Sequence, residues 1–221
     1  MGKDILIAKA VASDEFEKVF DRERQMLINQ CINTAYDMVT KYSLQAPEWI
    51  TSGRGKRIIP ELKNSAVEFC IIQACKRNIL PFEVSFENNA RKTGKYLKLK
   101  YKEASLTVNQ TRSVKVSSRD AKFRKELLRT FTTCLNLFNI DENMIPSKYY
   151  FEINHGYQSK TPIFTVAGIP DGNHGWIFSK KLNMLTALSK GESDDLKTVS
   201  KDIESFGPDE FRKYLNDVKD E

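Results

Sequence analysis

Residues 96–102 have the sequence Tyr96-Leu97-Lys98-Leu99-Lys100-Tyr101-Lys102, in which two kinds of side chain alternate. Successive side chains of a β-strand point to opposite faces, so this alternation predicts a strand with an apolar face and a lysine-rich face. Apolar residues at helical spacing precede this stretch, and segments with helical spacing and segments with strand-like alternation follow it. The chain is therefore predicted to combine helices with strands.

Two long helices are predicted before this strand. Apolar residues recur near helical spacing from Phe16 to Met38, which predicts a helix over residues 14–42. A loop follows over residues 44–57, and Pro60 suits the first turn of a second helix that ends near Arg77. The opening segment, residues 4–12, is short and apolar, and we expect a strand or a packed arm there.

Two β groups are predicted, with a helix over residues 119–138 between them. Ser117 and Asp120 have the spacing of a helix cap. The tail is expected to hold two short charged helical stretches that are split at Gly207-Pro208. Runs of strands segregated from runs of helices predict an α+β fold with two antiparallel β groups. The predicted strands are residues 82–86, 96–101 and 104–108 in the first group, and 149–153, 162–167 and 176–178 in the second.

Length and composition suggest how the chain is divided. The 221 residues are 40% hydrophobic and 29% charged, as in ordinary globular proteins, and no linker rich in Pro, Gly or Ser interrupts them. We expect one α+β domain over residues 1–190 and a helical, acidic appendage over residues 191–221. No apolar run approaches the roughly 18–20 residues of a membrane span, so we expect a soluble, cytoplasmic protein with no membrane partner. Nothing in the sequence indicates the oligomeric state.

The positive charge is concentrated in the middle of the chain. The formal net charge is +6, yet residues 53–129 alone carry 19 basic and 7 acidic side chains, between mildly acidic ends. Such asymmetry indicates a polyanion partner for the middle region, or masking of that region by the acidic tail. A clustered basic region is typical of nucleic-acid binding, although it does not indicate the type of nucleic acid.

Three separate elements carry these cations. The loop over residues 52–57 has glycines that let the backbone approach a phosphate, and Trp49 nearby is placed to stack on a base. The lysines of the strand repel one another unless an anion compensates, although lysines also protect edge strands from aggregation. One face of the helix over residues 119–138 is basic, which is also typical of a solvated surface. The candidate nucleic-acid-binding residues are Arg54, Lys56, Arg57, Lys98, Lys100, Lys102, Arg119, Lys122, Lys125 and Arg129.

Signals for catalysis are weak, and the sequence identifies no catalytic residues with certainty. Its two histidines, His155 and His174, each lie between Asn and Gly. Two imidazoles that met at one end of a sheet would perform metal-free acid–base cleavage of RNA, with Lys160 or Lys180 stabilising charge. Ordinary turn residues are the alternative. The only Glu-x-Lys triplet, Glu61-Leu62-Lys63, begins a helix rather than lying on a strand, which disfavours a restriction-type nuclease.

Neither a metal nor a cofactor is expected. The four cysteines fall at apolar positions of predicted helices without a C-x-x-C motif. The first hypothesis is a nucleic-acid-binding protein of a bacterium or its mobile elements, which contacts phosphates through the basic middle region. The alternatives are an adaptor or immunity-type module that binds an acidic protein partner, and a metal-free ribonuclease that uses His155 and His174.

Overall fold

The computed structural model describes residues 2–89, 92, 94–135, 149–156, 159–182 and 201–217. The chain forms two compact units, each built from several segments. Unit 1 contains Met1–Asp21, Phe82–Asn154 and Val166–Lys181, and unit 2 contains Arg22–Pro81, His155–Thr165 and Leu182–Glu221. Helices and one six-stranded sheet account for the regular structure, which confirms the predicted α+β class.

The six strands follow chain order across a single sheet, β1-β2-β3-β4-β5-β6. The pairs β1–β2, β2–β3 and β5–β6 are antiparallel. The two predicted β groups therefore exist, and they join into one sheet because β3 and β4 are neighbours. The strands are β1 (Glu83–Asn88), β2 (Lys95–Tyr101), β3 (Ala104–Gln110), β4 (Tyr149–His155), β5 (Thr165–Pro170) and β6 (Trp176–Lys181).

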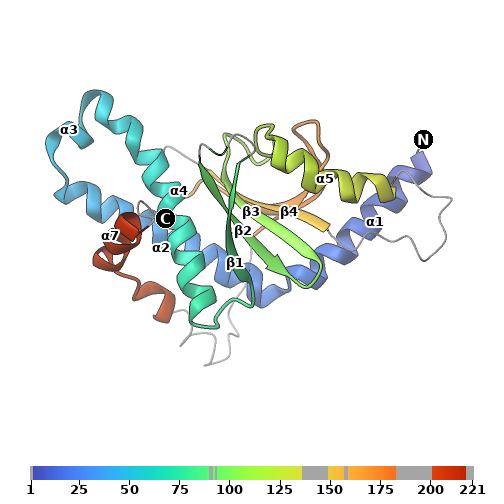
Figure 1. The fold of residues 1–221 in the computed structure, drawn as a ribbon, viewed down its shortest axis with the longest axis horizontal. Helices are drawn as coiled ribbons and strands as arrows, with labels where there is room; N and C mark the ends of the chain where they lie inside the picture. The colour runs from blue at the N-terminus through green and yellow to red at the C-terminus, as the bar shows by residue number, and fades with distance from the viewer. Residues whose placement is uncertain are drawn as a thin grey trace. The chain divides into compact units, whose positions relative to one another are not determined.

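Two helices cover the sheet in unit 1, α1 (Gly2–Val19) and α5 (Lys122–Leu135), and Figure 1 shows the strands between them. Phe16 of α1 packs on Phe151 of β4 and Phe178 of β6, with ring centroids 6.4 and 5.2 Å apart. On the opposite face of the sheet, Phe123 of α5 stacks on Tyr96 of β2 at 3.7 Å. These aromatic contacts fix both layers because large rings bury much apolar area.

The first helix corrects the expectation of a strand or arm over residues 4–12. That segment is helical, and α1 continues without a break to Val19. Alanine has the highest helix propensity, and the three alanines of residues 8–12 outweigh their β-branched neighbours. The predicted long helix over residues 14–42 is instead interrupted at Phe20 and Asp21, and the chain restarts as α2 at Arg22.

Unit 2 is built on two packed helices, α2 (Arg22–Gln45) and α4 (Ile59–Lys76). Between them lie α3 (Glu48–Thr51) and a 3₁₀-helix, η1 (Gly53–Ile58), where a loop was expected. Phe69 of α4 contacts Phe211 and Tyr214 of α7 (Pro208–Asp217), with ring centroids 5.5 Å apart in each case. The C-terminal helix therefore contributes to the core of this unit.

The tail confirms the predicted split, because residues 201–204 are helical and α7 begins at Pro208. The proposed division at residues 190 and 191 lies outside the described residues and stays a prediction. Among the helices that are described, none has the length and apolar character needed to cross a bilayer.

Candidate anion-binding site

Three of the predicted phosphate contacts in unit 1 already have acidic partners. Lys98 pairs with Glu87 at 2.7 Å, Lys100 with Glu83 at 3.5 Å, and Lys125 with Asp120 at 2.8 Å. For the two lysines of β2, the neighbouring strand β1 supplies both carboxylates. The expected repulsion along the strand is therefore relieved within the sheet, without an external anion.

The remaining candidates of unit 1 are dispersed. Lys102 lies in the turn after β2 rather than on the lysine face of the strand, with a φ of 53° and its ammonium 5.3 Å from the Tyr101 ring centroid. Arg119 and Lys122 are exposed, and neither forms an ion pair with another described residue. Helix α5 begins at Lys122, so Arg119 precedes it. The side chain of Arg129 lies outside the described part of the chain.

The three candidate cations of unit 2 differ from the paired lysines of unit 1 because no described acidic residue pairs with them. Arg54, Lys56 and Arg57 lie on η1, all three are exposed, and within the described ranges none of them has a carboxylate within ion-pair distance. Gly53 begins this helix with a φ of +51°, a left-handed conformation that favours glycine. The side chain of Trp49, which was expected to stack on a base, is not among those described.

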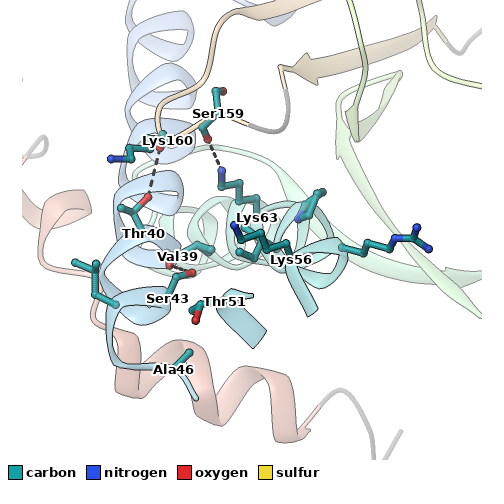
Figure 2. A pocket seen from close by; sticks show the side chains of 13 residues that line it. Val39, Thr40, Ser43, Ala46, Thr51, Lys56, Lys63, Ser159 and Lys160 are labelled. Carbon is teal, nitrogen blue, oxygen red and sulfur yellow. Dashed lines mark hydrogen bonds between the residues drawn. The ribbon is translucent and has the colours of Figure 1, made fainter. Parts of the chain in front are cut away.

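A pocket of about 920 Å³ adjoins η1 in unit 2 (Figure 2). Its walls come from the end of α2, from α3 and η1, from the start of α4, and from residues 159–160. Hydroxyl groups of Thr40, Ser43, Thr51 and Ser159 supply polar lining. Among the described residues that line it, every charged one is cationic, and these are Lys56, Arg57, Lys63 and Lys160.

Lys63 is the least exposed of these four cations. Its residue is only 5% exposed, because helical spacing places it on the same face of α4 as the buried Ala66, Val67 and Cys70. Its ammonium donates a hydrogen bond to the Ser159 carbonyl, as Figure 2 shows, and lies 4.9 Å from the centroid of the Tyr36 ring. Burial lowers the pKa of this amine, and no described carboxylate forms an ion pair with it.

A buried hydrogen bond joins Tyr36 to one of the two histidines. The Tyr36 hydroxyl and His155 Nδ1 are 2.9 Å apart, and both residues are fully buried. Burial, reinforced by the charge of Lys63, lowers the pKa of His155 to about 4. The imidazole is therefore neutral near pH 7, and its burial separates it from solvent.

The second histidine has a different environment. His174 is exposed in the turn before β6, with a φ of 63° and its Nε2 3.9 Å from Asp120. The two imidazoles thus have different partners, Tyr36 for one and Asp120 for the other. A fully buried His155 argues against its direct contact with RNA, and the ribonuclease alternative stays a prediction.

A second polar cluster lies inside unit 1 around Glu152 of β4. This carboxylate is 2% exposed and accepts hydrogen bonds from the Ser118 backbone amide at 2.8 Å and the Ser118 hydroxyl at 2.5 Å. It also accepts from the Tyr150 hydroxyl at 3.1 Å and from the Asn154 amide at 3.0 Å. These four donors satisfy the carboxylate and attach the segment before α5 to the sheet.

Sequence reasoning did not select Lys63, Tyr36 or Glu152 as site residues. Lys63 was visible only as part of a Glu-x-Lys triplet, although its spacing of three and four from Ala66 and Val67 indicated a lysine on a buried helix face. No group of three metal-ligating side chains is found among the described residues. No family model, curated protein or solved structure matches this chain.

Proposed function

We propose that the protein binds nucleic acid and that the pocket of unit 2 contacts its phosphate groups. The observation that carries this proposal is that every charged residue in the described lining is cationic. Cations without acidic partners keep their full attraction for an external anion, and phosphate contacts release counterions from the polymer.

The geometry favours the pocket over the basic strand as the main contact. Lys98 and Lys100 would have to exchange their carboxylate partners for phosphates, whereas Lys56 and Arg57 have no such partners among the described residues. A concave site also suits a compact phosphate group better than the flat acidic surface of a folded protein. We therefore rank the acidic-protein alternative second.

Direct binding assays test this function. Purified protein is mixed with labelled single- and double-stranded DNA and RNA, with magnesium or with a chelator, and samples are run on native and denaturing gels. We expect slower migration on the native gel and intact strands on the denaturing gel. Shortened strands would favour the nuclease alternative, and unchanged migration of all four polymers would contradict the proposal.

A further inference from the structure

The pocket of unit 2 combines its cations with an apolar lining. Apolar side chains from α2 and from the junction of η1 with α4 reach the same cavity as the four cations. Its volume of about 920 Å³ falls in the range of pockets that enclose small ligands. A ligand for this pocket therefore needs both an anionic group and an apolar body. The apolar lining residues are Val39, Leu44, Ala46, Ile59 and Pro60.

The buried amine of Lys63 is the reason to expect an anionic group on the ligand. An ammonium has three hydrogen-bond donors, and the Ser159 carbonyl accepts only one of them. A buried charge without a counter-charge is costly, and a phosphate oxygen in the pocket would supply both the acceptor and the opposite charge. Lys56 lines the same cavity and adds a second cation for the same group.

The exposed side chain of Leu44 is the reason to expect an apolar part on the ligand. This side chain lines the pocket and is 83% exposed, the highest exposure among the large apolar residues described. A ligand that covers this side chain removes apolar surface from water, which favours binding. The face of a nucleobase is an apolar surface that is linked to a phosphate by one sugar.

We infer that this pocket takes one nucleotide of a single-stranded nucleic acid, with the phosphate at Lys63 and Lys56 and the base against Leu44. The inference rests on the proposed function and narrows the class of ligand from nucleic acid in general to single strands. A base inside a duplex is stacked and paired, and it would have to leave the stack, at a free-energy cost, before it could enter a concave pocket. Single strands present their bases without that cost.

Mononucleotides test the inference without a polymer. Titration calorimetry compares AMP and UMP with inorganic phosphate and with adenosine, each against the full-length protein. We expect both nucleotides to bind at least about tenfold more tightly than phosphate or nucleoside, because only they engage both kinds of lining. Equal affinities for AMP and phosphate would overturn the inference.

Two variants test the phosphate contact and the base contact separately. Lys63→Met keeps an unbranched chain without the charge, and we expect it to weaken AMP and phosphate binding alike. Leu44→Ser changes an exposed residue, so folding is preserved, and we expect about fivefold weaker AMP binding with unchanged phosphate binding. The matched control is Lys98→Gln, which removes a charge outside the pocket. If Leu44→Ser leaves AMP affinity unchanged, the inference is wrong.

Competition distinguishes failure of this inference from failure of the proposed function. AMP should displace a labelled single strand from the protein, and single strands should bind more tightly than duplexes of equal length. If single strands bind but AMP neither binds nor competes, the nucleotide pocket is refuted and the proposed function stands. If no nucleic acid and no nucleotide binds, both are refuted.

Discussion

Lys63 and Lys98 belong to the same basic region of the sequence, yet their surroundings differ. Lys98 lies on a strand whose neighbour carries Glu87, whereas Lys63 lies on the buried face of α4 without a described carboxylate partner. The burial of Lys63 was not predicted, although helical spacing within one segment carries that signal. The acidic partner of Lys98 depends on the register between β1 and β2, which no single strand reveals.

The buried histidine gives a prediction at the scale of one residue. His155 has an ordinary pKa of 6.5 that burial lowers to about 4, so the unfolded chain takes up its proton first as pH falls. Its contribution to the free energy of unfolding should therefore be complete above pH 6.5 and decrease toward pH 4. The total loss is on the order of 3 kcal/mol, since each pKa unit corresponds to about 1.4 kcal/mol.

Urea unfolding at several pH values from 4 to 7 measures this effect. The wild-type protein should lose stability on acidification more steeply than His155→Gln, whose amide does not titrate. The matched control is His174→Gln, because that imidazole is exposed. Equal pH slopes for the wild-type protein and His155→Gln would contradict the assignment.

At the scale of elements, the sequence predicted each strand and the helix α4 within a few residues, whereas α1 and α2 were predicted in part as one helix over residues 14–42. Alternation and helical spacing are local signals, which is why these elements were found. The sequence did not predict the break before α2 at Asp21, and it placed the start of α5 at residue 119 rather than at Lys122. The chain before α5 instead forms hydrogen bonds with Glu152, a partner 34 residues away, which a local capping pattern does not reveal.

The contact between Ser118 and Glu152 gives a prediction for the segment before α5. Ser118→Ala removes the hydroxyl donor and leaves part of a buried carboxylate unsatisfied. We expect a loss of about 1.5–3 kcal/mol in the free energy of unfolding, the usual range for a hydrogen bond to a charged group. Urea unfolding measures it, with the more exposed Ser113→Ala as the control. Equal losses of unfolding free energy in the two variants would contradict a stabilising role for the hydrogen bond between Ser118 and Glu152.

At the scale of the whole molecule, the basic middle region divides between the two units. Residues 53–81 belong to unit 2, and residues 82–129 belong to unit 1. A continuous stretch of charge in the sequence is therefore not a continuous surface of one unit. The net charge and its clustering were predictable from the sequence. Which cations pair with carboxylates could not be predicted, because such pairs depend on contacts between distant segments.

The dependence of affinity on salt tests the central claim most directly, namely that the unpaired cations of the pocket contact phosphates. Two double variants remove the same charge: Lys56→Gln with Arg57→Gln in the pocket, and Lys98→Gln with Lys100→Gln on the strand. Fluorescence anisotropy of a labelled single strand measures affinity from low to high salt. We predict that the pocket variant reduces the log–log slope by about 1 for each lost contact, and that the strand variant leaves it nearly unchanged. An unchanged slope for the pocket variant, with a reduced slope for the strand variant, would contradict the account.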